Sequence, residues 1–165
     1  LANQPWFPLR QDQDYVRYTD IAWVERDWIY DIITPFIHTA NRDAEWNVDI
    51  DWKETMQYGV YSKDHFYDWH QDSDHPFDDT NPIGLRGKVR KLTIIMLLSD
   101  PNTDYEGGEL QFDFGPYEPN RYHTVSEGDK GNLIVFPSFL FHRVKPVTSG
   151  VRRSLVCWNC GPQWR

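Results

Sequence analysis

The stretch from residue 131 to residue 158 constrains the fold of this chain most strongly. Three short apolar runs follow one another there, at 133–136, 139–141 and 154–158. Proline and glycine residues separate the runs, and such residues punctuate turns. Apolar runs of this length between turn residues predict β-strands. The stretch therefore predicts three consecutive short strands.

The last of these strands carries an arginine. Because side chains alternate along a strand, one face holds a set of four: Arg152, Ser154, Val156 and Trp158. An arginine that faces inward needs an anionic partner, since a buried unpaired charge is very costly. A carboxylate of the protein or of a bound ligand would serve equally well. His142 lies ten positions before Arg152, across one turn, so the two can face one cavity from neighbouring strands.

A second pattern, His70-x-Asp72, supplies groups that would complete such a cavity. Two histidines and one carboxylate suit a non-haem Fe(II) centre with open positions for substrate and oxygen. The pair alone is a weak signal because it arises readily by chance. Its conjunction with a histidine after an apolar strand, and then with Arg152 and Ser154, is more specific. The candidate metal ligands are His70, Asp72 and His142, and the other four histidines are interpreted as surface or structural.

This conjunction resembles the Fe(II)/2-oxoglutarate-dependent oxygenases, and within them the prolyl-4-hydroxylase-like group. The resemblance covers residues 55–165 and is most specific in its last third. The residues that carry it are Tyr61 ahead of 67–72, Gly107-Gly108-Glu109-Leu110, the run 131–136, His142-Arg143-Val144 and Gly150-x-Arg152-x-Ser154. Before residue 55 only a helix followed by strands agrees with the family.

The resemblance implies roles for the remaining pocket residues. In the family, the arginine at the position of Arg152 binds the distal carboxylate of 2-oxoglutarate, and Ser154 is placed to assist it. Tyr61 is expected to hydrogen-bond the cosubstrate or the substrate, and Trp158 to line the cosubstrate pocket. Some relatives add a tyrosine from the central strand, which this chain lacks, so Thr93 or Tyr61 is the expected substitute.

The activity that the resemblance implies is hydroxylation of an unactivated C–H bond with Fe(II), 2-oxoglutarate and O2. 2-Oxoglutarate would become succinate and CO2, and ascorbate is a further expected reductant. A prolyl residue or a proline-like molecule is the leading substrate, whether peptidyl or small. Two alternatives stay open: a cupin-type metal dioxygenase that does not use 2-oxoglutarate, and a catalytically silent jelly-roll binding module.

Strand-like runs between turn signals, after one helical segment, predict a mainly β domain. We expect a double-stranded β-helix, the cupin-like jelly roll, with a packed N-terminal helix. One domain over 1–165 is expected, with an extended segment and helix in 1–45 and the jelly-roll core in 46–165. The helix is expected to start at Thr19 or Asp20 and to reach Ala40, kinked or ended at Pro35.

Alternating apolar residues in 46–51 predict a strand, as does the run 55–61. Residues 71–87 are polar and rich in turn residues, which predicts a loop that is either solvated or a lid over the metal. The basic residues at 86, 88, 90 and 91 are interpreted as a solvated edge, with steering of an anionic substrate as the alternative.

The net charge of −8 argues against non-specific binding to nucleic acid, which requires a basic surface. The two cysteines, Cys157 and Cys160, lack a second pair at zinc-site spacing, so we interpret them as structural. No apolar run approaches membrane-spanning length and no signal peptide is recognised. A soluble cytoplasmic protein without membrane or nucleic-acid partners is expected, and the oligomeric state is not predicted.

Overall fold

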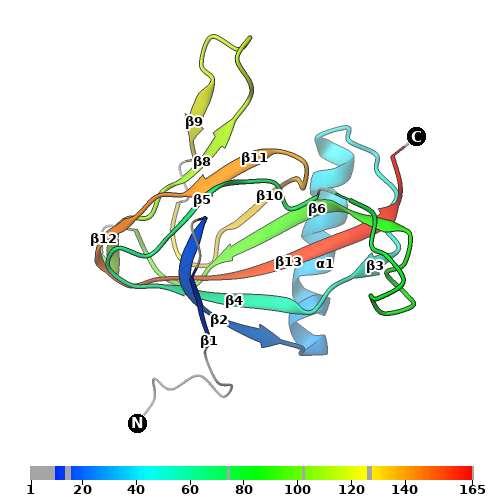
Figure 1. Ribbon diagram of the computed structural model, residues 1–165, viewed down its shortest axis with the longest axis horizontal. Coiled ribbons are helices and arrows are strands. Elements are labelled where there is room, and N and C mark those ends of the chain that lie inside the picture. Colours follow the sequence, from blue (N-terminus) through cyan, green and yellow to red (C-terminus); the bar gives the residue numbers. More distant parts are fainter. Residues whose placement is uncertain (1–9, 14–15, 74, 102, 126–127, 165) are drawn as a thin grey trace.

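Antiparallel strand pairs make up most of the architecture (Figure 1). The computed structural model describes residues 10–13, 16–73, 75–101, 103–125 and 128–164. Within these ranges there is one helix, α1 (Asp27–Asp43). The strands are β1 (Arg10–Gln13), β2 (Arg17–Val24), β3 (Trp52–Lys53), β4 (Met56–Tyr61), β5 (Phe66–His70), β6 (Lys88–Leu97), β7 (Tyr105–Gly107), β8 (Leu110–Asp113), β9 (Tyr122–Thr124), β10 (Leu133–Pro137), β11 (Phe141–Val144), β12 (Val147–Gly150) and β13 (Arg152–Pro162).

One long curled sheet contains all but two of these strands. Its order is β10-β6-β13-β4-β2-β5-β11-β8-β9, with β1 added beside β2 and β3 beside β13. The pair β7–β12 forms a separate two-stranded sheet. Every pairing between these strands is antiparallel. The curl brings distant strands to face one another across an interior, as the expected jelly roll requires.

The two faces of the central strands have different partners. Along β6 and β13 alternate side chains point to opposite faces. Ile94 and Cys157 belong to an outer apolar cluster that includes α1, and Figure 1 shows α1 crossing these strands. Ile95 and Val156 belong to an inner cluster inside the curl. The sheet thus has a helix-covered outer face and an inner face that is free to build a cavity.

Helix α1 packs through one apolar stripe. Its buried residues are Tyr30, Ile33 and Ile37, whose spacing places them on one helical face. Pro35 lies inside the helix, and the helix continues past it to Asp43. The expected N-terminal helix is therefore present, but it runs through Pro35 rather than ending there.

The expected start of this helix is wrong. Residues 17–24 form β2, which pairs with β4 and β5. Their inward positions include Arg17 and Thr19, which are polar, so the period-two burial was hidden in the hydropathy pattern. Ile21 and Val24 matched helical spacing by coincidence. The extended segment predicted ahead of the helix contains β1, while residues 1–9 and 14–15 lie outside the described ranges.

The strand predicted over 46–51 is also absent. The alternation of Trp46, Val48 and Ile50 is real, because all three pack against the outer cluster. Their backbone does not join a ladder. Instead the Asn41 side chain hydrogen-bonds to both backbone polar groups of Val48. Its Nδ2 donates to the Val48 carbonyl at 2.9 Å, and its Oδ1 accepts from the Val48 N–H at 3.0 Å. A helix side chain thus replaces a strand partner.

Residues 71–87 form a loop as predicted, with no helix or strand among those described.

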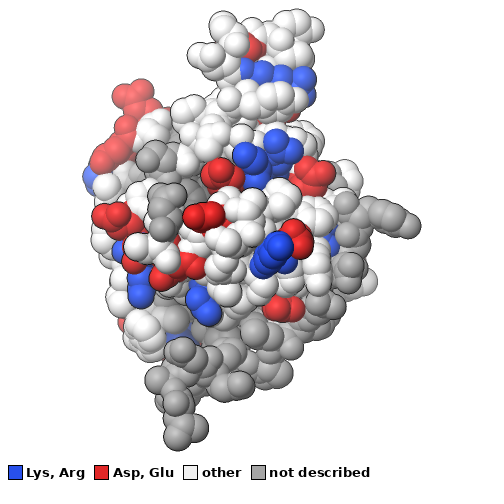
Figure 2. Space-filling model, turned by 90° about the vertical axis from the view of Figure 1, so that its left-hand side faces the viewer, with Lys and Arg blue, Asp and Glu red and all other residues white. Residues whose placement is uncertain are grey.

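The β8–β9 hairpin projects from the body of the molecule (Figures 1 and 2). Figure 2 shows acidic and basic side chains interspersed over the face beneath it. Within the described part of the chain, no helix is both long and apolar enough to cross a membrane.

Candidate metal and cosubstrate site

Two histidines and an aspartate converge inside the curl of the sheet. β11 pairs with β5 so that His142 lies directly opposite His70, and Asp72 follows β5 after one residue. The His70 Nε2 atom lies 3.7 Å from Asp72 Oδ1, and His142 Nε2 lies 3.6 Å from Asp72 Oδ2. Ligand atoms of the three residues all lie within 4.8 Å of one another. Of the residues the structure describes, these alone form a group suited to a metal ion.

Backbone carbonyls orient both imidazole rings. His70 Nδ1 lies 2.7 Å from the Asp68 carbonyl oxygen, and His142 Nδ1 lies 2.8 Å from that of Leu140. A carbonyl oxygen can only accept, so each Nδ1 carries the proton and donates. In the neutral form of either ring, Nε2 then keeps its lone pair on the side of Asp72. This is the tautomer and orientation that a metal ligand requires.

The protonation states of the site also suit a metal. Burial, together with the neighbouring His142, lowers the pKa of His70 to about 4. Burial opposes ionisation of Asp72, but the adjacent His142 and His70 and a hydrogen bond from Thr93 outweigh it and lower the pKa of Asp72. At neutral pH the carboxylate is ionised and His70 is neutral. Metal ions bind these deprotonated forms.

The candidate cosubstrate arginine lies at the start of β13 and is 1% exposed. Its Nη1 donates to Ser154 Oγ at 3.3 Å, and its guanidinium carbon lies 5.5 Å from the centre of the Tyr61 ring. Tyr61 is the residue directly opposite Arg152 in the β4–β13 ladder. Gly108 also contacts this side chain: a Cβ built there would lie 3.1 Å from Arg152 Cδ. This close approach leaves little room for a side chain at position 108.

All eight residues singled out from the sequence line one narrow cavity. In the part of the chain that the structure describes, the lining residues are Arg17, Gln57, Tyr61, Tyr67, His70, Asp72, Thr93, Ile95, His142, Val144, Arg152, Ser154, Val156 and Trp158. Among the described residues, two guanidinium groups and one carboxylate therefore face this space, in a chain whose net charge is −8. Such a lining favours an anionic ligand beside the metal ligands.

The strands that carry His142 and Arg152 are not neighbours, contrary to expectation. β4, β2 and β5 lie between β13 and β11 in the sheet order. The two side chains meet because the sheet curls and brings its inner face around one cavity. The prediction that His142 and Arg152 share one cavity therefore agrees with the structure. The predicted reason, that their strands are neighbours in the sheet, is wrong.

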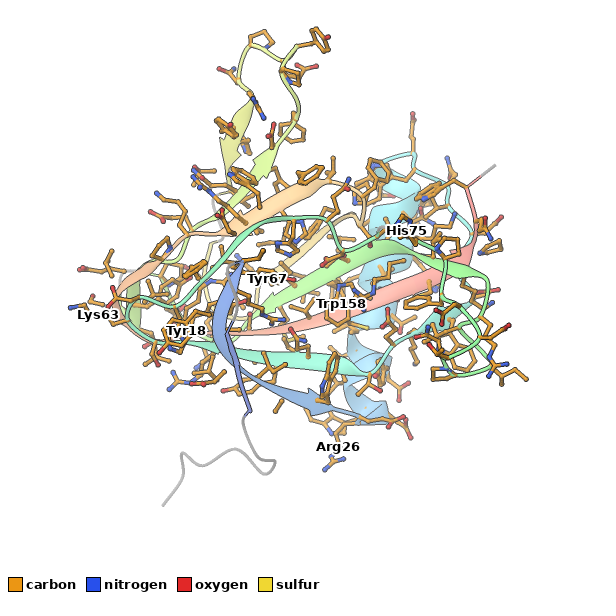
Figure 3. All side chains as sticks on the ribbon, viewed as in Figure 1. Tyr18, Arg26, Lys63, Tyr67, His75 and Trp158 are labelled. Carbon is orange, nitrogen blue, oxygen red and sulfur yellow. The ribbon has the colours of Figure 1, made fainter. Side chains whose placement is uncertain are left out.

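Three polar lining residues, Arg17, Gln57 and Tyr67, had no role assigned from the sequence. Arg17 and Gln57 are hydrogen-bonded to each other, and the Arg17 guanidinium carbon lies 4.5 Å from the centre of the Tyr67 ring. Tyr67 stacks on His70 with ring centres 3.5 Å apart, and burial raises the pKa of Tyr67 to about 12. Figure 3 shows Tyr67 and Trp158 inside the curl. Arg17 lies ahead of the recognised motifs, so no sequence signal marked it.

The interpretation of residues 86–91 as a solvated edge is wrong at two positions. Arg90 Nη2 donates to Glu54 Oε2 at 2.8 Å, and its guanidinium carbon lies 4.1 Å from the centre of the Trp158 ring. Lys91 is only 4% exposed, and its Nζ lies 3.6 Å from the Trp164 ring centre. Both cations are held against indole rings by cation–π contacts.

Cys157 and Cys160 are both buried as free thiols. Burial raises the pKa of Cys157 to about 12 and also raises that of Cys160. Thiols kept protonated in this way are poor metal ligands and nucleophiles. The structural interpretation of the C-x-x-C pattern is consistent with these environments.

The donor set fits Fe(II). Two imidazoles and one carboxylate on one side of a cavity form the ligand combination of non-haem iron sites that leave positions open. The buried guanidinium of Arg152 fits the carboxylate of an anionic cosubstrate, which it can bind in a bidentate manner. The residues present thus match both groups that the expected family uses.

Comparison with known structures confirms the fold. A Pseudomonas putida prolyl-4-hydroxylase superposes with a TM-score of 0.65 at 20% identity, covering 94% of this chain and 78% of that one. A Trichoplax adhaerens prolyl hydroxylase, in complex with a hypoxia-inducible factor peptide fragment, gives a TM-score of 0.66 at 21% identity, over 92% and 70% of the two chains. The expected double-stranded β-helix is therefore present.

Sequence comparison finds similar proteins among the PKHD-type hydroxylases. A PKHD-type hydroxylase of Synechococcus sp. (strain CC9902) is 36% identical over 98 residues, which is 56% of this chain and 35% of that protein. One from Xylella fastidiosa (strain M23) is 32% identical over 108 residues, 62% of this chain and 42% of that protein. The chain thus spans less than half the length of these relatives. The family model for the 2OG-Fe(II) oxygenase superfamily matches residues 56–160, which include the triad and Arg152, and the chain therefore belongs to that superfamily.

Proposed function

We propose that this chain is a Fe(II)- and 2-oxoglutarate-dependent hydroxylase that acts on an unactivated C–H bond of a prolyl or proline-like substrate. The products from 2-oxoglutarate would be succinate and CO2. The observation that supports this best is the convergence of His70, Asp72 and His142 in a cavity that also contains the buried Arg152. That combination accommodates metal and cosubstrate together.

In this proposal His70, Asp72 and His142 hold the iron. The Nδ1 hydrogen bonds of the two histidines, and the Thr93 hydrogen bond to Asp72, fix the metal-binding atoms in advance. These side chains therefore need little further ordering when the metal binds. When bound, the iron and 2-oxoglutarate supply the oxygen-activating chemistry, as is usual when a cofactor carries the difficult step. The protein supplies orientation and a cavity that excludes water.

Arg152 would bind the distal carboxylate of 2-oxoglutarate, assisted by Ser154 and Tyr61. The guanidinium is buried, where a charge-assisted bond to a carboxylate is strong. Trp158 would line the same pocket. Its indole Nε1 is buried and has no hydrogen-bond acceptor among the described residues, so a bound ligand can provide one.

A prolyl substrate is supported by the relatives rather than by the cavity. The similar sequences are PKHD-type hydroxylases, and the similar structures are prolyl hydroxylases, one of them in complex with a peptide. Aromatic walls such as Tyr67 and Trp158 suit an apolar ring without selecting proline. The proposal therefore includes both a peptidyl prolyl residue and a small proline-like molecule.

Succinate formation tests the proposal. Protein supplied with Fe(II), ascorbate, 2-oxoglutarate and O2 should form succinate, and a proline-containing peptide or free proline should accelerate it and gain one oxygen atom. His142→Ala and Arg152→Ala should abolish or strongly reduce it. Two matched controls should retain it: His123→Ala in exposed β9, and Arg153→Ala, whose side chain is absent from the cavity lining.

The alternatives give different results. Product formed without 2-oxoglutarate, and unaffected by Arg152→Ala, would indicate a metal dioxygenase of another type. No succinate with any substrate, from folded and iron-loaded protein, would indicate a silent binding module.

A further inference from the structure

We infer that Ser138 and Thr93 form a relay that positions Asp72 as a metal ligand. The inference rests on the proposed metal site and concerns two residues that bind no metal themselves. Thr93 Oγ1 lies 2.7 Å from Asp72 Oδ2 and 2.9 Å from Ser138 Oγ. Thr93 and Ser138 are both 0% exposed. Both contacts are therefore shielded from bulk water.

The direction of both hydrogen bonds follows from the donors available. An ionised carboxylate can only accept, so the Thr93 hydroxyl donates its single proton to Asp72. Thr93 then has only lone pairs left for Ser138, which must be the donor in the second bond. The chain of hydrogen bonds thus runs from Ser138 to Thr93 to Asp72 and ends at the candidate ligand. A donated proton in a buried site stabilises the charged form of the carboxylate.

The backbone of Ser138 also hydrogen-bonds to the backbone of Asp72. The Ser138 carbonyl accepts from the Asp72 N–H at 2.9 Å and from the Ser73 N–H at 3.0 Å. Arg90 adds a hydrogen bond from Nη1 to the Asp72 carbonyl at 3.3 Å. The main chain and the carboxylate of Asp72 are therefore both fixed, although Asp72 lies beyond the end of β5.

The turn between β10 and β11 thereby supports two of the three candidate ligands. Ser138 binds Asp72, and the Leu140 carbonyl accepts from His142 Nδ1. In the same turn the Phe139 carbonyl accepts from the side chain of Gln71, the residue between His70 and Asp72. One short turn therefore ties the His-x-Asp segment to the strand that carries the distal histidine. Its hydroxyl at 138 is the part that reaches the carboxylate.

The relay explains a pattern on β6. Thr93 points into the cavity from the middle of a strand whose next inward residue is the apolar Ile95. A valine would fill the same space and suit a strand equally well. The hydroxyl is therefore the distinguishing feature of this position, and Asp72 is the group that uses it.

Cobalt(II) binding tests the relay without depending on turnover. Thr93→Val keeps the shape of the side chain and removes the donor, and it should weaken Co(II) binding by about 10–100-fold, as is typical when a supporting hydrogen bond is lost. The visible spectrum of bound Co(II) should also change, because the carboxylate can rotate. Thr93→Ser restores the hydroxyl and should recover the affinity and spectrum of the wild type.

Thr19→Val is the matched control. Thr19 is also 0% exposed and donates its hydroxyl proton at 2.9 Å to the Val60 carbonyl, but it does not line the cavity. Both valine variants lose a buried hydrogen bond and should unfold at lower urea concentration. Only Thr93→Val should lose Co(II) affinity.

Wild-type affinity and spectrum in Thr93→Val would overturn the relay. If that variant does not fold, Ser138→Ala decides: a several-fold weaker Co(II) affinity supports the relay, and an unchanged affinity overturns it. Wild-type protein that binds no Co(II) would instead refute the metal site, and with it the proposed function.

Discussion

One glycine sets how closely the chain approaches the candidate cosubstrate arginine. Gly108 has a φ of +65°, a backbone conformation that favours glycine. A Cβ at this position would lie 2.9 Å from Val147 Cγ2 and 3.1 Å from Arg152 Cδ. Both distances are shorter than ordinary van der Waals contact. Gly108 is therefore required twice, for its backbone conformation and for the room it leaves to Arg152.

Gly108→Ala should weaken 2-oxoglutarate binding. The added methyl group must displace Arg152, while the left-handed backbone adds strain of roughly 1–2 kcal/mol. Calorimetric titration of the Co(II)-loaded protein with 2-oxoglutarate measures the effect. Gly87→Ala is the control, because Gly87 has a φ of +72° and nothing within 4 Å of a built Cβ. Gly87→Ala should be strained but should bind 2-oxoglutarate normally. Equal 2-oxoglutarate affinity in the two variants would contradict the proposed role of Arg152 in binding the cosubstrate.

At the residue scale the sequence predicted the candidate ligands, but not the groups that hydrogen-bond to them and orient them. The positions of His70, Asp72 and His142, with Arg152 beyond them, followed from spacing and resemblance. The carbonyl groups that orient the histidines, at Asp68 and Leu140, could not be predicted because every residue has a carbonyl. Ser138 was likewise hidden, since a serine before a strand has no distinctive spacing to Thr93.

Helix α1 is held on the outer face of the sheet by three side chains. Tyr30, Ile33 and Ile37 join the cluster that includes Met56 and Leu92. The opposite face exposes apolar residues as well, among them Ile32, which is 50% exposed. Apolar content alone therefore does not show which face of α1 is packed.

Ile37→Ala should cost about 2–5 kcal/mol of unfolding free energy, because it removes buried methyl groups and leaves a cavity. Ile32→Ala, in the same helix, should cost less than about 1 kcal/mol, as surface substitutions generally do. Urea unfolding of the metal-free protein measures both. Equal losses in the two variants would show that the helix does not pack through the face described.

The errors at element scale have a common physical origin. In β2 the inward positions include Arg17 and Thr19, so a strand that builds the cavity lacks the apolar alternation of a strand that builds only a core. In 46–51 the alternation is present, but Asn41 occupies the backbone positions that a neighbouring strand would use. Hydropathy therefore shows neither that a polar side chain is buried nor which group pairs with the backbone.

The site joins parts of the molecule that are distant in the sequence. His70 and Asp72 lie at the end of β5, His142 in β11 and Arg152 in β13. The unfolded chain cannot bring these groups together, so a metal that binds all three ligands binds only the folded state. Binding must then stabilise the whole fold by mass action.

Co(II) at a hundred times its dissociation constant should add about 2.7 kcal/mol of stability. For a chain of this size that corresponds to a rise in Tm of roughly 5–10 °C. Differential scanning calorimetry with and without Co(II) measures it. His142→Ala should lose most of the rise and His123→Ala should keep it. An equal rise in both variants would place the metal elsewhere.

Anaerobic absorption spectroscopy tests the central claim most directly, namely that one cavity holds both Fe(II) and 2-oxoglutarate. We predict a visible charge-transfer band that requires both additions, is absent in His142→Ala and is weakened in Arg152→Ala. Arg153→Ala should show the band at full strength. Wild-type protein that binds Fe(II) but gives no band with 2-oxoglutarate would contradict the assignment.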